Sequence, residues 1–253
     1  MRLLAFDTST EVMAVAVCAG AQRLAVTAPG GAAASASLLP RIEALLAEAG
    51  LAFGDLEAIA LGCGPGAFTG LRASCAVAQG LGFGLGRPVI AIDSLLVVAE
   101  DARAQAARGE RIAEGAQQGR PTCEVAVAMD ARMDEAYAAC YRHDGARWHV
   151  ACAPALRSLA ALNAAWRDAT PDLVAGSALA VFGARVECPQ RALRIEREHD
   201  RAAALLRLAE AAAARGEGVD AAQALPVYLR DKVALTTVER EAAKAVRAGG
   251  AAR

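Results

Sequence analysis

Residues 62–72 read GCGPGAFTGLR, and they lie between an apolar run at 57–61 and a helical pattern at 71–85. Another apolar run follows at 88–92. A strand, a glycine-rich turn, a helix and a second strand form a βαβ unit, in which the two strands are parallel and the crossover is right-handed. This stretch therefore predicts an α/β fold with a parallel pair of strands.

The sequence before this unit predicts three strands that are joined by very short connections. They are expected at 2–6, 12–17 and 23–27. Such connections join antiparallel neighbours, because a parallel crossover needs a dozen or more residues. A helix is expected at 37–49, where apolar residues recur at helical spacing and Gly50 is a stop signal.

The second half of the chain begins with the same kind of pattern. A strand ends in Asp130, as the first strand ends in Asp7, and a polar turn and another β-rich run follow. In the remainder of the chain, strands are expected at 123–129, 136–141 and 172–175, and helices at 94–107, 158–166 and 200–215. The half-match hints at two related α/β domains, although it is too degenerate to define a repeat.

The domain boundaries follow from this pattern. Residues 108–120 are polar and lack an aliphatic run, which is typical of a linker or a solvated insertion. We therefore predict an N-terminal domain at 1–107 and a second, smaller domain at 121–233. The helix at 200–215 could pack back on the first domain, and a tail at 234–253 is expected to fray.

Composition and charge exclude several classes of protein. The 253 residues include 27 Lys and Arg against 28 Asp and Glu, a net charge of −1, so the chain lacks the broad basic surface of a stand-alone nucleic-acid binder. The apolar run at 3–6 stops at Asp7, far short of a signal peptide or a membrane span. Seven cysteines without a Cys-x-x-Cys pair predict reduced, mostly buried thiols. We therefore expect a cytoplasmic protein without membrane contact.

The glycine-rich turn allows several interpretations. Glycines before a helix N-terminus can receive an anion, and the spacing also fits a dinucleotide-binding turn with Asp93 after the next strand. However, Pro65 removes one N–H from such a cradle. A Walker loop is excluded, because Leu71 and Arg72 stand where Lys and Ser or Thr are required. The remaining interpretation is a tight turn whose glycines serve helix–strand packing.

The polar run at 7–10 has two interpretations as well. It could hold a magnesium-bound phosphate, or it could form an ordinary Asx or Ser turn. Few positively charged side chains could help to bind a phosphate there, since lysine is almost absent from the middle of the chain. The candidates for such a residual phosphate loop are Asp7, Thr8, Ser9, Gly64, Gly66, Thr69, Gly70 and Arg72.

Histidines and cysteines do not indicate catalysis or a metal site. His143, His149 and His199 show none of the spacings that place two histidines on one helix face. Cys63 lies in the glycine-rich turn without a histidine nearby in sequence, so a passive small residue is expected there rather than an activated thiol. We assign no catalytic residue and no metal ligand.

The helix at 71–85 is apolar almost all round and must be buried almost all round. One side can rest on the sheet. The other side needs a neighbour, either from the same chain or from a partner subunit, and both remain open here.

Five segments occur in an order that resembles the TsaB (YeaZ) family. They are LAFDTST at 4–10, LLP at 38–40, the glycine-rich turn at 62–72, AMDARM at 128–133 and PVYLR at 226–230. The resemblance runs from residue 2 to about 233, and the FTGLR ending of the turn is highly specific. It implies the actin-like, ribonuclease H-like fold of the ASKHA superfamily, duplicated in two domains with mixed sheets flanked by helices.

The resemblance also implies a role in tRNA N6-threonylcarbamoyladenosine (t6A) synthesis. TsaB proteins pair with the paralogue TsaD, which carries the metal site and transfers the threonylcarbamoyl group to the adenosine beside the anticodon, and the ATPase TsaE joins the pair. This chain is then expected to be a non-catalytic subunit. ATP and a metal ion would be used by the complex and not bound by this chain alone. Contact with tRNA would come through the complex, and a homodimer could form when the partner is absent.

The family pairs its subunits through helices of the N-terminal domain, which places the expected interface on 37–49 and 70–85. The candidates that follow from the resemblance are Leu38, Arg41, Ile42, Leu45, Leu71, Cys75, Ala78, Gly82 and Leu85.

This chain departs from the family pattern at a few positions. Family members often have His-Ser where this chain has Ala34 and Ser35, and an Arg and a Ser where it has Cys63 and Ala67. The loss of a cation and a hydroxyl argues against nucleotide binding by this chain alone. Two alternatives are an ATPase or small-molecule kinase of the same fold and a glycoprotease-like metallopeptidase.

Overall fold

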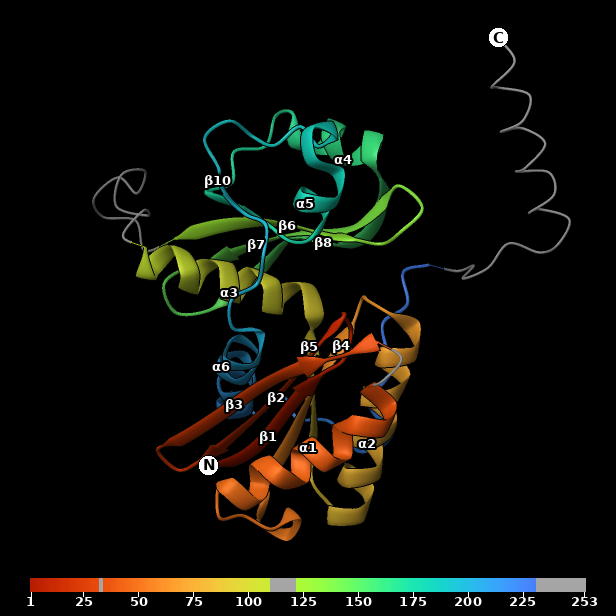
Figure 1. Cartoon of the computed structure of the whole chain (residues 1–253). Coiled ribbons are helices and arrows are strands. Elements are labelled where there is room, and N and C mark those ends of the chain that lie inside the picture. Colours follow the sequence, from red (N-terminus) through yellow and green to blue (C-terminus); the bar gives the residue numbers. More distant parts are fainter. Residues whose placement is uncertain (32–33, 110–121, 231–253) are drawn as a thin grey trace, which may run out of the picture.

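The computed structural model describes residues 1–31, 34–109 and 122–230. Figure 1 shows two lobes, each built on a twisted sheet, with α3 (Ser94–Arg108) lying between them. Most of the predicted linker and the tail lie outside the described residues.

The first lobe contains a five-stranded mixed sheet in the order β3-β2-β1-β4-β5. Its first three strands are antiparallel neighbours, and β4 and β5 continue the sheet in parallel to β1. The strands are β1 (Arg2–Asp7), β2 (Val12–Ala19), β3 (Gln22–Pro29), β4 (Ala58–Gly64) and β5 (Val89–Asp93). The predicted antiparallel triplet and the βαβ unit are therefore confirmed.

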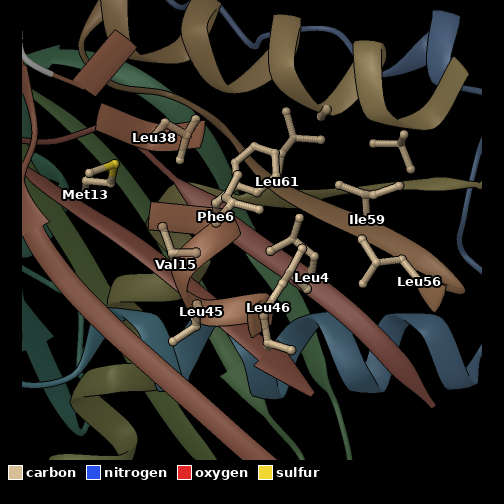
Figure 2. Close-up of a cluster of buried hydrophobic side chains, with 14 of the residues drawn as sticks. Leu4, Phe6, Met13, Val15, Leu38, Leu45, Leu46, Leu56, Ile59 and Leu61 are labelled. Atoms are coloured by element: carbon tan, nitrogen blue, oxygen red, sulfur yellow. The ribbon is translucent and has the colours of Figure 1, made fainter. Parts of the chain in front are cut away.

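Helices cover both faces of this sheet. On one face lie α1 (Ala34–Glu48) and α2 (Phe68–Leu85), and a short 3-10 turn, η2 (Phe53–Asp55), precedes β4. Figure 2 shows this core, in which Phe6 and Leu61 from the sheet meet Leu38 and Leu45 from α1. The alternation of buried side chains along β1 and β2 supplies one layer to each face of the sheet.

The other face of the first sheet is covered by α6 (Arg201–Ala214), which comes from the far end of the chain. It packs on β1 and β2 and also against α3. Sheet and helix meet through small residues such as Ala14 and Ala16 on the sheet and Ala204 and Ala209 on the helix. Alanine contacts allow close approach, so the high alanine content of the chain serves this layer.

The second lobe repeats the strand order of the first. Its sheet runs β10-β9-β6-β7-β8, so that its first strand, β6, is again followed on one side by antiparallel pairings, β6 with β7 and β7 with β8, and on the other side by two parallel strands, β9 and β10. The strands are β6 (Cys123–Asp130), β7 (Glu135–His143), β8 (Trp148–Ser158), β9 (Leu173–Ala175) and β10 (Leu193–Ile195). The two sheets therefore share one strand order.

The second sheet lies between α3 on one face and two short helices on the other. These are α4 (Leu159–Trp166) and α5 (Ala178–Phe182), followed by the 3-10 turn η3 (Gly183–Arg185). The sequence did not predict three elements of this lobe, namely the strands β8 and β10 and the helix α5. The helix α2 begins at Phe68, three residues earlier than expected, because Gly62–Gly64 extend β4 and shorten the turn.

Candidate functional site

The turn after β1 and the turn after β4 pack directly against each other. A methyl group on Gly62 would lie 2.1 Å from Asp7 Oδ2, and one on Gly70 would lie 1.8 Å from the carbonyl oxygen of Thr8. Gly62 is therefore required to leave room for the Asp7 side chain, and Gly70 is required for the close approach of two backbone segments. Of the interpretations of the glycine-rich turn, the structure supports helix–strand packing.

Polar groups of the two turns are used within the chain. The backbone N–H of Ala67 donates to the carbonyl of Ser9 at 2.7 Å, and that of Gly64 donates to Ser94 Oγ at 3.0 Å. The Thr8 hydroxyl donates to the carbonyl of Gly70 at 2.6 Å. An anion at this turn would have to compete with these bonds, because a cradle needs N–H groups that point outward.

Asp7 forms a buried ion pair with Arg201. Its Oδ2 accepts from Arg201 Nη2 at 2.8 Å and from the Ser94 hydroxyl at 3.0 Å, while Oδ1 accepts from the backbone N–H of Ser9 at 2.6 Å. Asp7 is fully buried and Arg201 is 2% exposed, and Arg201 also pairs with Glu198. An arginine from α6 thus neutralises the carboxylate that we considered as a magnesium ligand.

The electrostatics of this pair follow from burial and charge. Burial opposes ionisation of Asp7, but the Arg201 guanidinium and the hydrogen bonds from Ser9 outweigh it, and the pKa of Asp7 is lowered. Burial likewise opposes the charge of Arg201, yet Asp7 and Glu198 raise its pKa. Both groups are therefore charged at neutral pH, as expected for a buried pair with good geometry.

The phosphate-loop candidates do not line a common open site. Asp7, Thr8, Ser9, Gly64, Gly66 and Gly70 come together, but as parts of the packed turns described above. Thr69 is exposed on the first turn of α2. The Arg72 guanidinium lies over the Phe68 ring at 3.8 Å and contacts the Tyr228 hydroxyl at 3.3 Å, so it is not directed at Asp7.

A cavity of about 460 Å³ lies between the lobes, beside these turns. Its floor in the first lobe includes Ser9 and Ser94, and the second lobe contributes the β6–β7 hairpin. Three consecutive residues of that hairpin, 132–134, have positive φ angles of 64°, 59° and 57°. Arg230 holds the hairpin in place through the carbonyl of Ala131 at 2.9 Å and the carboxylate of Glu135 at 2.7 Å.

A hydrogen bond between Tyr141 and Asp93 joins the two lobes. The Tyr141 hydroxyl of β7 donates to Asp93 Oδ2 at the end of β5, at 2.5 Å. Burial raises the pKa of Asp93 above its ordinary value, although the bond from Tyr141 opposes this rise. Burial and the charge of Asp93 in turn raise the pKa of Tyr141. Asp93 therefore caps α3 and ties the lobes together, instead of facing a dinucleotide.

Sequence reasoning missed Arg201 and Tyr141. Arg201 is the first residue of an alanine-rich helix, and its partner Asp7 lies 194 residues away, so no local pattern could have linked them. A charged residue on the apolar, buried face of the helix would have been the available signal. Within the described residues, no three His, Cys, Asp or Glu side chains are grouped as metal ligands, and no helix there has the length and apolarity to cross a bilayer.

Comparison with known proteins shows which family has this arrangement. A family model described as TsaD, tRNA N6-adenosine threonylcarbamoyltransferase, matches residues 28–193. The tRNA threonylcarbamoyladenosine biosynthesis protein TsaB of Escherichia coli (strain K12) is 30% identical over 248 residues, which cover 92% of this chain and 96% of that protein. The chain belongs to the TsaB/YeaZ family.

Two further relatives agree with this membership in the TsaB/YeaZ family. TsaB of Haemophilus influenzae is 39% identical over 137 residues, but the match spans only 54% of this chain and 52% of that protein. A solved structure from Pseudomonas aeruginosa, described as similar to peptidase YEAZ, is 40% identical with a TM-score of 0.75. It covers 90% of this chain and 99% of that one. The expected fold class is thereby confirmed.

The interface candidates taken from the TsaB/YeaZ resemblance lie mostly inside the first lobe. Their shared feature is contact with the core beneath α1 and α2, and the buried members are Leu38, Ile42, Leu45, Leu71, Cys75, Ala78 and Gly82. Arg41 and Leu85 are half-buried. The helical spacing that selected them marks the face that rests on the sheet, so these buried side chains do not form an outer surface.

The chain itself covers one flank of α2, so for this flank the structure shows the first of the two possibilities, a neighbour from the same chain. Residues 217–230 run along the helix and include the 3-10 turn η4 (Ala221–Gln223). A methyl group on Gly82 would lie 2.7 Å from Ala221 Cβ, and Gln79 donates to the carbonyl of Ala224 at 3.1 Å. At the end of this segment, the Val227 N–H donates to the carbonyl of Cys63 at 2.7 Å.

The outer side of α2 nevertheless remains uncharged and exposed. Ala76, Gly80, Phe83 and Gly84 face solvent, and Phe83 is 62% exposed. The sequence has no charged residue between Arg72 and Arg87. On the neighbouring α1, Leu39 and Pro40 are exposed as well. We call these six exposed residues the α1–α2 face of this TsaB/YeaZ chain; they are Leu39, Pro40, Ala76, Gly80, Phe83 and Gly84.

Proposed function

We propose that this chain is a non-catalytic subunit of the complex that makes t6A in tRNA. In this proposal it binds a TsaD-type paralogue and supports transfer of the threonylcarbamoyl group to the adenosine beside the anticodon. The observation that carries the non-catalytic part is the buried pair of Asp7 and Arg201, which occupies the place where a kinase of this fold would need a free carboxylate.

The environment of Asp7 argues against phosphate chemistry by this chain. Both carboxylate oxygens already accept hydrogen bonds from the protein. A magnesium-bound phosphate would have to displace the buried Arg201 guanidinium from Asp7 and break the hydrogen bonds that the guanidinium makes with Asp7 and Ser9. The residues present therefore do not fit a metal-bound nucleotide. We infer that ATP and the metal ion used in the reaction belong to other subunits.

The α1–α2 face supports the partner-binding part of the proposal. A solvated helix normally carries charged residues on its outer side, whereas the outer side of α2 carries alanine, glycine and phenylalanine. Small residues allow another helix to approach closely, and a large exposed aromatic side chain can fill a pocket on a partner. This combination is typical of a helix that is covered in a complex.

The family model supports the choice of a TsaD-type paralogue as the partner. The TsaD model matches residues 28–193, a range that includes both α1 and α2, so a TsaD-type paralogue has equivalents of both helices. Two such helix pairs can meet about an approximate two-fold axis, as in isologous dimers. The same geometry would let two copies of this chain pair when the paralogue is absent. We place TsaE and tRNA as further members of the assembly.

Reconstitution tests the proposal. The TsaD paralogue, TsaE, tRNA and a threonylcarbamoyl donor are combined with and without this chain, and t6A is measured by nucleoside mass spectrometry. We expect co-elution of this chain with the TsaD paralogue and t6A formation only when both are present. Full transfer without this chain would contradict the proposal. Calorimetry with Mg-ATP and this chain alone should show no binding, and sub-micromolar binding with turnover would favour a kinase or ATPase.

A further inference from the structure

Two cysteines of the second lobe lie directly opposite each other on adjacent antiparallel strands. Cys140 of β7 pairs with Cys152 of β8 in the strand register. Opposed residues of an antiparallel pair have side chains on the same face of the sheet, with Cα atoms about 4.5–5.5 Å apart. A disulfide requires Cα atoms about 4.4–6.8 Å apart, a range that includes the usual spacing of such opposed residues.

The ladder is irregular on both sides of this pair, which gives the strands local freedom. The register shifts between Ala138 and Cys140 and again between Cys140 and Tyr141. The β8 strand contributes the extra residues of both bulges, because Ala155 opposes Ala138 and Val150 opposes Tyr141. It is also the last strand at its edge of the sheet. A small shift of β8 that brings the two sulfur atoms into bonding distance therefore disturbs few neighbouring bonds.

The two thiols differ in accessibility. Cys152 is exposed, whereas Cys140 is half-buried and its thiol donates to Glu124 Oε1 at 3.3 Å. Burial and the Glu124 carboxylate raise the pKa of Cys140 to about 12. An oxidant from solution therefore meets Cys152 first, and Cys140 is placed to react second.

We propose that Cys140 and Cys152 form a reversible disulfide by exchange with a low-molecular-weight disulfide such as oxidised glutathione. The Cys152 thiolate attacks one sulfur of glutathione disulfide, and one glutathione thiolate leaves. The Cys140 thiolate then attacks the Cys152 sulfur of the mixed disulfide, and the second glutathione thiolate leaves. Two protein thiols are oxidised, one glutathione disulfide is reduced to two glutathione thiols, and protons exchange with water.

This inference is independent of the proposed function, since the pair lies in the second lobe and its chemistry needs no partner. The bond would fasten the edge strand β8 to β7 and close the hairpin that contains Trp148. Trp148 Nε1 donates to the buried carboxylate of Glu100 on α3 at 3.1 Å. The disulfide would thus stiffen a hairpin that reaches the helix between the lobes.

The test uses the full chain in glutathione buffers of increasing oxidised fraction, followed by alkylation and peptide mass spectrometry. We expect a crosslinked peptide that joins Cys140 to Cys152, reversal by excess reduced glutathione, and a rise in Tm of about 5 °C. Cys140→Ser should stop at a mixed disulfide on Cys152, and Cys152→Ser should leave Cys140 unmodified. Cys188→Ser, which changes another half-buried cysteine of this lobe, should leave the crosslink unchanged.

The rate of ring closure gives a second measurement. In the mixed disulfide, closure should accelerate about tenfold per pH unit between pH 7 and 9, because the thiolate fraction of Cys140 rises tenfold per unit below its pKa. Glu124→Gln should accelerate closure at fixed pH by removing the adjacent negative charge. The proposal is overturned if both thiols of the native chain stay alkylatable in fully oxidised glutathione, or if the native chain retains the mixed disulfide as Cys140→Ser does.

Discussion

Arg201 Nη2 donates to Asp7 Oδ2 at 2.8 Å and so joins the first helical residue of α6 to the last residue of β1. The pair ties the C-terminal part of the chain to the centre of the first sheet. It also occupies a carboxylate that lies at the end of the central strand. The Asp7–Arg201 contact therefore both stabilises the fold and keeps the Asp7 carboxylate from acting as a free ligand for phosphate chemistry.

Arg201→Met should destabilise the chain by about 3–5 kcal/mol in urea unfolding, because it leaves the buried carboxylate of Asp7 without its partner. Adding Asp7→Asn to this variant should restore part of the loss, with a coupling energy of about 2 kcal/mol. Arg23→Met is the matched control, since it breaks the surface pair with Glu210 and should cost less than about 1 kcal/mol. Equal losses in Arg201→Met and Arg23→Met would contradict this account.

The contribution of the Asp7–Arg201 pair should depend on pH in the acid range. The pKa of Asp7 is lower in the folded chain than its ordinary value of 3.8, so the folded state binds fewer protons there than the unfolded state. The stability from this pair is complete above about pH 5 and is lost as the pH falls through the lowered folded pKa. The difference in unfolding free energy between the native chain and Arg201→Met should therefore shrink progressively as the pH falls below 3.8, the ordinary pKa of Asp7. A difference that grows as the pH falls below that value would contradict the assignment.

Tyr141→Phe should destabilise the chain by about 2 kcal/mol at pH 7, because the buried Asp93 carboxylate loses its hydroxyl donor. The pKa of Asp93 is raised in the folded state, so its ionisation already weakens stability as the pH rises through that pKa. Without Tyr141 Oη, stability should decline more between pH 4 and pH 7, so the stability difference between the native chain and Tyr141→Phe should be smaller at pH 4 than at pH 7. Urea unfolding of both chains at the two pH values measures this difference. A larger difference at pH 4 would refute the prediction.

Two glycines of α2 should respond in opposite directions to alanine. Gly70→Ala would place a methyl group 1.8 Å from the backbone carbonyl of Thr8, so we expect a loss of at least about 3 kcal/mol. Gly80→Ala meets nothing within 4 Å and should stabilise the same helix by about 0.5–1 kcal/mol. Thermal and urea unfolding of both variants test the packing role of the glycine-rich turn. Tolerance of alanine at Gly70 would revive the anion-binding interpretation.

The sequence predicted the first lobe well because its elements carry strong local signals. The three closely spaced apolar runs and the helix after the glycine-rich turn specify their partners by connection length alone. The β8 strand was missed because it lies at an edge, is largely exposed, contains Pro154 and is interrupted by two bulges, so its side chains do not alternate. Short elements such as β10 and α5 leave too few residues for a periodic pattern.

The site was less predictable than the fold, because its contacts join distant residues. The spacing of α2 correctly indicated burial on more than one side, but Ala221 and Ala224, which cover one flank, lie in a segment without periodicity. Most of the residues expected at an interface are therefore core residues, with Arg41 and Leu85 half-buried, and the exposed Phe83 was not selected. A helical pattern identifies the buried face, and the tertiary structure decides which side remains open.

Phe83→Asp should weaken binding to the TsaD paralogue at least about 30-fold, because a charge would replace the large apolar side chain on the outer side of the last turn of α2. Val150→Asp is the matched control, since Val150 is 60% exposed against 62% for Phe83 but lies on β8 in the other lobe. Both variants should unfold like the native chain, because neither side chain is buried. Calorimetry or surface-based titration with the purified paralogue gives the two dissociation constants. If Phe83→Asp binds as tightly as Val150→Asp, the α1–α2 face is not the docking surface, and partner binding must involve another part of the molecule.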